Sequence, residues 1–388
     1  MPVKNRFAEL LPEIIAWRRD FHAHPELMFD LPRTAGRVAE LLRGFGADEV
    51  VEGIGRSGVV AVIRGRTDSR GRAIGLRADM DALPIEEETG LPHASTTPGK
   101  MHACGHDGHM AMLLGAAKYL AETRAFDGTA VLVFQPAEEG GGGGDEMVRD
   151  GLMERFGIDE IYGMHNWPGV PLGTFAIREG AVMAACDQFR ITVTGRGGHA
   201  AKPHQAIDPV LVASQIVVAL QTVASRLTDP LAPVVLSVCT LRAGTGAYNV
   251  IPQTAELRGT LRSLDPDLRP AAEAQLRRIA SLTAEAAGAS AALDWMPGYP
   301  ATVNALEPTR AAIAVAQAVA GSVDTDFPPQ MAAEDFSYML NARPGAYIFC
   351  GNGDSAILHH PGYEFNDEAI PFGASWYAGM IEARMPLD

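Results

Sequence analysis

The chain has 388 residues, 47% hydrophobic and 20% charged, which is the composition of a globular protein long enough for two domains. Its formal net charge of −15 at pH 7 argues against nucleic acid or an anionic membrane as a partner, because both bind basic surfaces. Four scattered cysteines favour a reducing compartment, and we see neither a signal peptide nor the roughly 20 apolar residues that span a bilayer, so we expect a cytoplasmic, non-membrane protein.

The first half of the chain alternates predicted helices and strands. Apolar residues at helical spacing predict helices at 11–22, 33–45, 110–120 and 146–154, and short apolar runs predict strands at 58–63, 73–76, 129–134 and 158–164. This alternation is typical of an α/β domain in which helices flank a central mixed sheet. Functional groups in such domains gather where strands end.

From about residue 183 the pattern changes. Alternating strands are predicted at 189–194, 234–241, 254–262 and 291–296, with helices at 209–226 and 266–287. Two strand–helix–strand halves of this size make a compact α+β unit. After residue 298 the pattern returns to helices and an apolar strand at 346–350. We therefore predict an α/β domain built from residues 1–182 and 298–388, interrupted by an inserted α+β domain at 183–297.

Residues 101–109 form the most unusual segment, with one thiol, three imidazoles and a carboxylate ahead of an apolar helix. Thiolate and neutral imidazole are the donors that zinc and its neighbours prefer, so Cys104 and His106 are candidate metal ligands. The alternative is a buried structural cysteine beside a helix start. Asp107 is expected to cap that helix, and His109, on its first turn, to support the ligands.

Glu138 and Glu139 lie between an apolar strand and five glycines. Neighbouring residues of an extended chain point in opposite directions, so one carboxylate can bind a metal while the other serves as general acid and base. The spacing does not say which does which. The glycines permit a tight turn, and no Gly-Lys-Ser/Thr follows them, so a phosphate-binding loop is excluded.

His165 and the pair His359–His360 are further candidate donors at the ends of predicted elements. Each could instead be an ordinary core or loop histidine. They gain weight because the Cys104 and Glu139 segments do not complete a metal site alone. Four such segments indicate one dinuclear metal centre and a metallohydrolase.

The chain also carries an ordered set of motifs that resembles the dinuclear-zinc aminoacylase and carboxypeptidase superfamily. The nearest match is its amidohydrolase branch, which includes hippurate hydrolases, bacterial N-acyl-L-amino-acid amidohydrolases and plant indole-acetyl-amino-acid hydrolases. The similarity covers essentially the whole chain, in RRDFHAHPE (18–26), RADMDALP (77–84), HACGHD (102–107), QPAEE (135–139), AEDFS (333–337) and HHPGYEFND (359–367). Each motif alone is weak, but the ordered set is specific.

The resemblance implies a role for each candidate residue. Two divalent metal ions per subunit, zinc being favoured over manganese, cobalt or nickel, would be held by Cys104, His106, Glu139, His165 and His359. Glu138 would be the general base. The inserted domain would be a lid or dimerisation domain. There His199 would stabilise the oxyanion, and Asn249 and Arg262 would hold the substrate's carboxylate. By spacing alone these last three residues are unremarkable.

One departure from the superfamily concerns Asp79 and Asp81. The carboxypeptidase branch has a metal-binding His-x-Asp ahead of a proline, whereas this chain has Asp79-Met80-Asp81. The metal placement of that branch therefore cannot be copied to this chain. We expect Asp79 and Asp81 to support the ligands from behind.

The resemblance implies an amidohydrolase that cleaves N-acyl-L-amino acids, with acetyl, benzoyl or aryl-acetyl groups, into a carboxylate and a free amino acid. A dipeptidase or carboxypeptidase on the same scaffold is the alternative within the enzymes. A catalytically inert metal- or ligand-binding protein is the alternative outside them, and it is disfavoured because Glu138 and every ligand are present. A homodimer or homotetramer is expected, with His199 acting within its own chain or across the interface.

Overall fold

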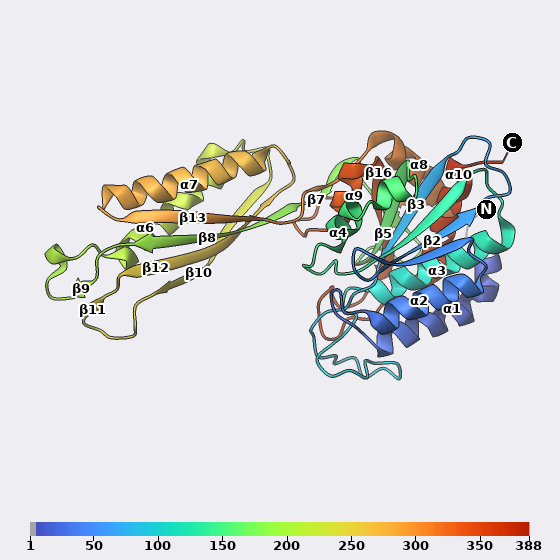
Figure 1. The fold of residues 1–388 in the computed structure, drawn as a ribbon, viewed down its shortest axis with the longest axis horizontal. Coiled ribbons are helices and arrows are strands. Elements are labelled where there is room, and N and C mark those ends of the chain that lie inside the picture. The colour runs from blue at the N-terminus through green and yellow to red at the C-terminus, as the bar shows by residue number, and fades with distance from the viewer. Residues whose placement is uncertain (1–4, 388) are drawn as a thin grey trace. The chain divides into compact units, whose positions relative to one another are not determined.

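The computed structural model describes residues 5–387, so the ends of the predicted first domain, residues 1–4 and 388, lie outside the described part. The chain divides into two compact units (Figure 1). The main unit comprises residues 5–182, 302–328 and 335–387. The inserted unit comprises residues 183–301 and 329–334. The return to the main unit thus comes later than the predicted position 298, and a second short segment joins the inserted unit.

A mixed eight-stranded sheet forms the centre of the main unit, which confirms the predicted α/β class. Its order is β1 (Glu49–Ile54), β2 (Gly58–Arg64), β4 (Thr129–Gln135), β3 (Ala73–Asp79), β5 (Glu160–Pro168), β16 (Gly345–Gly353), β6 (Phe175–Ala176) and β15 (Val323–Asp324). The central neighbours β4, β3, β5 and β16 are parallel. Their carboxyl ends therefore meet at one edge of the sheet, where polar groups can converge.

Helices flank this sheet. They are α1 (Asn5–Ala23), α2 (Pro32–Gly44), α3 (His106–Thr123), α4 (Gly143–Arg149), α5 (Leu152–Arg155), α8 (Leu306–Ala320), α9 (Phe336–Ala342) and α10 (Ile370–Arg384). Helix α3 packs against both α1 and α10, and its buried face joins the main hydrophobic core through side chains such as Met110, Leu113 and Leu114. The short strands β7 (Gly180–Met183) and β14 (Thr302–Asn304) pair in a separate two-stranded sheet.

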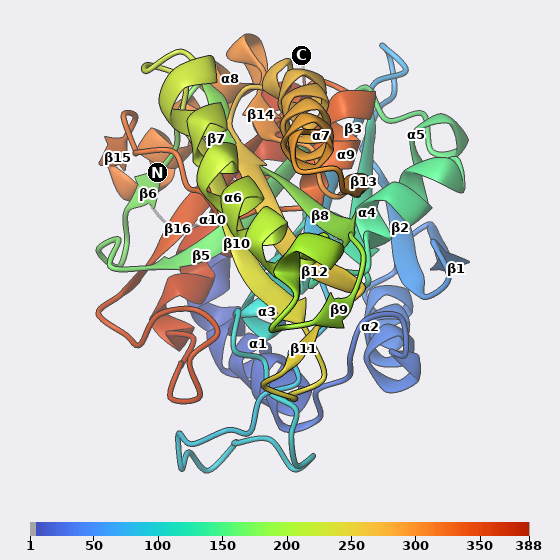
Figure 2. The same ribbon diagram turned by 90° about the vertical axis from the view of Figure 1, so that its left-hand side faces the viewer.

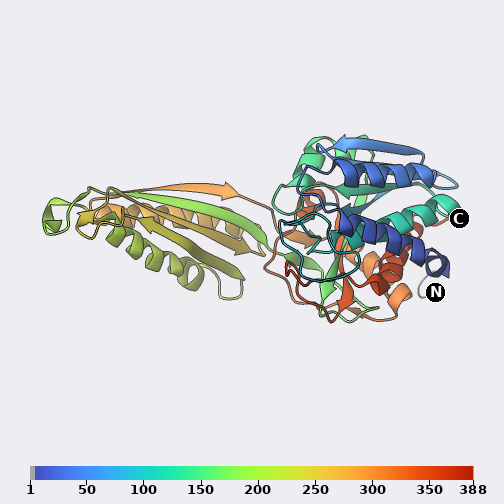
Figure 3. The same cartoon turned by 90° about the horizontal axis from the view of Figure 1, so that it is seen from below.

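The inserted unit is an antiparallel four-stranded sheet in the order β10 (Val234–Ala243), β12 (Thr254–Ser263), β8 (Ala185–Thr194) and β13 (Ser290–Pro297). Helices α6 (Pro209–Thr222) and α7 (Leu268–Ala286) lie side by side over one face (Figures 2 and 3). Residues of β8 alternate between buried and exposed, as a sheet with one covered face requires. Beyond the end of β8 and before the start of β12, the short strand β9 (Gly198–His199) pairs with β11 (Val250–Ile251).

Several predicted elements differ in extent from the observed ones. Strand β5 continues to Pro168, so His165 lies inside the strand and does not follow it. The predicted helix 146–154 is two short helices separated at Gly151, whose positive φ of 85° ends the first one. The edge strand β1 was not predicted, because its sequence EVVEGI mixes acidic and apolar residues.

One helical stretch, Pro209–Leu227, is apolar and long enough to cross a membrane by length and composition alone. It comprises α6 and a following π-helical turn, Val223–Leu227. Its inward side chains, including Val212, Ile216 and Leu220, form part of the hydrophobic core of the inserted unit. Burial of one face in this way is also what a core helix of a globular domain shows.

Candidate metal centre

The candidate ligands of the main unit come from four separate places in the fold. Cys104 precedes α3, and His106 is the first residue of that helix. Glu138 and Glu139 follow β4, and His165 lies in β5. His359 follows β16. Gly105 connects the first two with a φ of 87°, and a Cβ there would lie 2.2 Å from the amide of Asn166, so only glycine fits.

These side chains converge in one cluster. Potential ligand atoms of Cys104, His106 and His165 all lie within 4.8 Å of one another, and so do those of Cys104, Glu139 and His359. The Cys104 Sγ lies 3.4 Å from His165 Nε2, and His359 Nε2 lies 3.1 Å from Glu139 Oε1. His106 shares a third such group with Glu138 and Glu139. The five predicted ligands and the predicted base are therefore neighbours.

The His106 side chain provides a test of whether a metal fits here. Its Nδ1 is hydrogen-bonded to the backbone carbonyl of Asp81 at 2.7 Å, which leaves Nε2 to face the cluster. Nε2 is fully buried without a hydrogen bond. The carboxylate oxygen Asp79 Oδ2 lies 3.7 Å from it, which is too far for a hydrogen bond. This unpartnered imidazole nitrogen lies beside a thiol and carboxylates. Together they are the kinds of donor that a divalent transition metal prefers.

Glu138 and Glu139 occupy a tight turn, so the predicted extended conformation is wrong. Ala137, just before them, has a left-handed φ of 52°. The carboxylate of Asp81 accepts hydrogen bonds from the backbone amides of Glu138 and Glu139, at 2.9 and 3.1 Å. Asp81 thus holds this turn with its side chain and His106 with its backbone. These contacts suit the supporting role expected for Asp81, which stays a prediction.

Asp79 and His109 support the other side of the cluster. His109 Nδ1 lies 2.6 Å from Asp79 Oδ1, while its Nε2 accepts the backbone N–H of Asn166 at 2.9 Å. The amide of Asn166 in turn donates to the carbonyl of Cys104 at 2.7 Å and accepts from Tyr363 at 2.5 Å. The orientations of the His109 ring and of the Cys104 carbonyl are therefore fixed by buried hydrogen-bond partners.

The electrostatics of the cluster are dominated by burial and by its carboxylates. Burial, reinforced by Glu139 and Glu138, raises the pKa of the Cys104 thiol well above its usual range. Burial opposes a charge on His106, but Asp79 and Asp81 outweigh it and raise the pKa of that imidazole to about 10. Burial and the neighbouring His109 lower the pKa of His165. The carboxylates favour positive charge here, as a cation-binding site requires.

Asp107 does not cap α3. Its carboxylate instead binds the buried guanidinium of Arg18 at 3.0 Å and His22 Nδ1 at 2.9 Å. Burial opposes the charge on Asp107, but His22 and Arg18 hold its pKa below the usual range. His102 lies next to this network, fully buried, and is in none of the metal-binding groups among the described residues. The RRDFH and HACGHD motifs therefore meet behind the cluster.

The inserted unit carries the other three predicted residues. His199 is exposed and pairs with Val250 across β9 and β11, while the Asn249 carbonyl accepts the amide of Ala200 at 3.0 Å. His199 Nδ1 accepts the amide of Ala201 at 3.1 Å, so the neutral ring carries its proton on Nε2. His199 and Asn249 both line a cavity of about 710 Å³.

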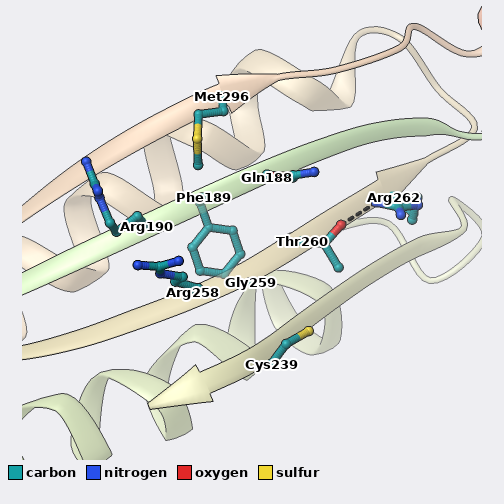
Figure 4. Close-up of a pocket in the computed structure, with 9 residues that line it drawn as sticks. All are labelled: Gln188, Phe189, Arg190, Cys239, Arg258, Gly259, Thr260, Arg262 and Met296. Carbon is teal, nitrogen blue, oxygen red and sulfur yellow. Dashed lines mark hydrogen bonds between the residues drawn. The ribbon is translucent and has the colours of Figure 1, made fainter. Parts of the chain in front are cut away.

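Arg262 lies on β12, on the sheet face that α6 and α7 leave open among the described residues. It lines a second cavity, of about 380 Å³, together with Gln188, Arg190 and Arg258 (Figure 4). Its guanidinium is hydrogen-bonded to Thr260 on the same strand. The three predicted residues of the inserted unit thus divide between the end of the sheet and its open face.

Comparison with known proteins identifies the family. The sequence model of Peptidase family M20/M25/M40 matches residues 75–383. Hippurate hydrolase of Campylobacter jejuni subsp. jejuni serotype O:2 is 42% identical over 379 residues, which cover 95% of this chain and 97% of that protein. The chain belongs to peptidase family M20/M25/M40. The resemblance seen in the sequence motifs is confirmed.

Two further comparisons bear on activity. Thermostable carboxypeptidase 1 of Saccharolobus solfataricus is 42% identical over 354 residues, 90% of this chain and 88% of that protein. The crystal structure of the Bacillus subtilis YXEP protein, a dinuclear metal binding peptidase from the M20 family, is 34% identical with a TM-score of 0.87, covering 97% and 99% of the two chains. This M20 chain is an amidohydrolase, a hydrolase that acts on amide bonds.

Two fully buried charged residues near the cluster were not predicted as site residues. Arg77 and Asp335 are fully buried and form an ion pair with 3.2 Å between Nη2 and Oδ1. Both belong to quoted motifs, RADMDALP and AEDFS, but the motifs gave them no role. A chemical signal was available in the sequence. Arg77 lies in an apolar strand and Asp335 at the start of a buried helix, and a buried charge requires a partner of opposite charge.

Proposed function

We propose that this chain hydrolyses N-acyl-L-amino acids with two divalent metal ions, zinc being favoured. The ligands would be Cys104, His106, Glu139, His165 and His359. The observation that carries the proposal is their convergence in one cluster, in which Cys104, His106 and His165 are buried, Glu139 is half-buried and His359 is exposed. In this cluster the orphaned Nε2 of His106 faces a thiol and carboxylates. The 42% identity to a hippurate hydrolase across nearly the whole chain supports an N-acyl-amino acid as the substrate.

Glu138 would act as the general base. It is buried beside Glu139 and His106, and its backbone is fixed by Asp81, so its carboxylate is held within a few ångströms of the ligand set. When bound, the divalent ions would supply Lewis acidity toward the amide carbonyl and water. Glu138 would take a proton from the attacking water and pass it to the leaving nitrogen. The products are a carboxylate and a free amino acid.

The inserted unit would recognise the substrate. The guanidinium of Arg262 suits the carboxylate of the amino-acid part, because a guanidinium can bind a carboxylate through two parallel hydrogen bonds. Asn249 lies beyond the opposite end of the ten-residue strand β12, so its amide would reach the same carboxylate from a second copy of the chain. His199 would stabilise the oxyanion, since its tautomer presents an N–H at Nε2. Both His199 and Asn249 are exposed, as residues that meet a substrate must be before it binds.

We further propose a homodimer or a homotetramer, built through the inserted unit. Helix α6 exposes Leu211 and Val218, which are 58% and 72% exposed, on the side away from its own core. Strand β10 is an edge of the four-stranded sheet and also exposes apolar residues, Val235 and Leu241. An unpaired edge beside apolar side chains favours pairing with a second copy. Four free cysteines support the expected cytoplasmic location.

A carboxypeptidase or dipeptidase on the same scaffold is the second candidate, supported by the 42% identity to a thermostable carboxypeptidase. The two are separated by a panel of acetyl-, benzoyl- and indole-acetyl-amino acids against free dipeptides and C-terminally free peptides. Each substrate is tested with zinc, manganese, cobalt or nickel. Turnover of N-acyl-amino acids without turnover of peptides supports the proposal, and the reverse pattern assigns the peptidase activity.

Metal removal provides the matching test. Prolonged chelation should abolish hydrolysis, and one of the four metals should restore it. Cys104→Ser replaces a thiolate with a far poorer ligand and should lower the bound metal per subunit. Cys350→Ser is a suitable control, because Cys350 is equally buried, in β16, and belongs to none of the metal-binding groups in the described residues. Full activity of the metal-free protein would disprove the mechanism.

A further inference from the structure

The loop that carries Glu138 and Glu139 is tied at both ends to one carboxylate. Asp335 Oδ1 accepts a hydrogen bond from the side chain of Gln135, at the end of β4, at 2.7 Å. Asp335 Oδ2 accepts the backbone N–H of Gly144, in the first turn of α4, at 2.8 Å. Asp335 is fully buried and immediately precedes α9. A single distant side chain therefore fixes where this loop begins and ends.

The loop between these two ties is tightly folded. Gly140 N donates to the carbonyl of Glu138 at 2.7 Å, and Gly143 N donates to that of Ala137 at 3.2 Å. A Cβ on Gly143 would lie only 1.7 Å from the carbonyl oxygen of Pro136, so the chain crosses itself at close range. A loop this compact transmits a shift at its ends to Glu138, because packed structure is poorly compressible.

Arg77 orients the carboxylate of Asp335 and links it to the metal-binding side. It is fully buried, with Nη2 at 3.2 Å from Asp335 Oδ1 and Nε donating to Gln135 at 2.9 Å. Its Nη1 donates to Asp79 Oδ2 at 2.7 Å. That same oxygen of Asp79 lies 3.7 Å from His106 Nε2. One guanidinium thus connects both ends of the loop to the ligand cluster.

We infer that Asp335 is a positioning residue for the reaction, which sets the place of Glu138 by holding the loop 135–144. The inference rests on the proposed function, in which Glu138 is the general base. The carboxylates of Asp335 and Glu138 come within 4.8 Å of each other, so the support is close to the group it serves. Misplacing a catalytic group by roughly 1 Å can cost about 100-fold in rate.

Asp335→Asn tests this directly. The substitution keeps the shape but removes the charge and places an amide NH₂ where one of the two ties needs an acceptor. We expect faster deuterium uptake in a peptide spanning residues 136–144, with kcat about 10- to 100-fold lower and KM changed less than about threefold. Metal content should stay at the wild-type level, because the five ligands are untouched.

Asp127→Asn is the matched control. Asp127 is also a buried carboxylate of the main unit, and it accepts the backbone amide of Ser69 at 2.8 Å just before β4 begins. The Asp127→Asn variant should lose a comparable free energy of unfolding. Its deuterium uptake in the 136–144 peptide and its kcat should stay at the wild-type level. If Asp335→Asn fails to fold, Gln135→Leu removes one tie and leaves the ion pair, with a smaller effect expected in the same direction.

The outcomes separate two failures. Unchanged loop uptake in the folded variant, a kcat within twofold of wild type, or an equal kcat loss in Asp127→Asn would each overturn the positioning role. Absence of hydrolysis by the wild-type, metal-loaded enzyme on any N-acyl-amino acid would instead remove the proposed function. Deuterium uptake would then still decide whether Asp335 holds the loop.

Discussion

The candidate site residues of the main unit and those of the inserted unit are held in different ways. In the main unit, Cys104, His106 and His165 are buried, and the rings of His106 and His165 are each oriented by a backbone carbonyl. In the inserted unit, His199 and Asn249 are exposed. The first set is therefore held in place by contacts within the main unit, whereas the second set is open to solvent.

This difference indicates a division of labour. Buried networks with every orientation fixed are suited to holding metal ions and a base at constant geometry, because nothing has to reorganise during the reaction. Exposed groups on short strands are suited to recognition, since they are free to meet a substrate and then to be covered. We therefore expect substitutions in the main unit to affect metal content and kcat. Those in the inserted unit should spare the metal.

The largest expected effect separates two neighbours within the main unit. Glu138→Gln keeps the shape of the side chain but removes the base, so turnover should fall about 10²- to 10⁴-fold while metal content persists. Glu139→Ala should instead lower the bound metal per subunit, measured by elemental analysis alongside kcat. An active Glu138→Gln enzyme, or full metal loss in that variant, would show that the two roles are reversed.

His199→Ala is expected to be the next largest. Loss of a preorganised oxyanion donor typically costs about 10²-fold in kcat, and metal content should stay normal because the cluster lies in the main unit. His204→Ala, which removes another exposed histidine of the inserted unit, is the control and should be close to wild type. A metal deficit in His199→Ala would break the division between the two units.

Mixing two inactive variants sharpens this test. If His199 acts across a subunit interface, combining His199→Ala with Glu138→Gln should regenerate sites that contain both wild-type residues, with up to about a quarter of wild-type activity expected from random pairing. Subunit exchange is confirmed separately with tagged chains. No recovery after confirmed exchange would assign His199 to its own chain.

The sequence predicted the class of fold and most of its elements because hydrophobic periodicity is local. Helix α7 and strand β12 begin and end within two residues of the predicted positions. Helix α6 begins at the predicted residue but ends four residues early, where the π-helical turn continues it. The ligand segments could also be found, because a thiol and several imidazoles close together in sequence have few structural uses. Helix boundaries near glycines, as at Gly151, were less accurate.

The supporting partners could not be predicted, because they are distant in sequence. Arg77 and Asp335 are 258 residues apart, and Arg18 and Asp107 are 89 apart. A local reading placed Asp107 at a helix cap, which is the common use of aspartate at that position, but a buried guanidinium competes successfully for its carboxylate. The turn at Glu138 is fixed by Asp81, which is 57 residues earlier. Tertiary contacts therefore decide the orientations on which the chemistry depends.

The smallest expected effect concerns Arg262, and it tests the recognition role of the inserted unit by substrate binding. Arg262→Lys keeps the charge but removes the planar fork that binds a carboxylate through two bonds. KM for an N-acyl-amino acid should rise about 10-fold, with kcat and metal content nearly unchanged. The same substrate with its carboxylate converted to a carboxamide should lose this dependence, because the fork then has no anion to bind.

Arg258→Lys is the matched control for that measurement. Arg258 lies on the same strand and the same open face and lines the same cavity (Figure 4). Its guanidinium pairs with Glu256 at 2.8 Å. Its KM should stay within about twofold of wild type, since an exposed ion pair contributes little. Equal increases in both variants would mean that the whole basic face attracts the substrate without a specific carboxylate site. A fall in kcat without a change in KM would instead show that Arg262 acts on the reacting atoms, which contradicts the recognition role expected for the inserted unit.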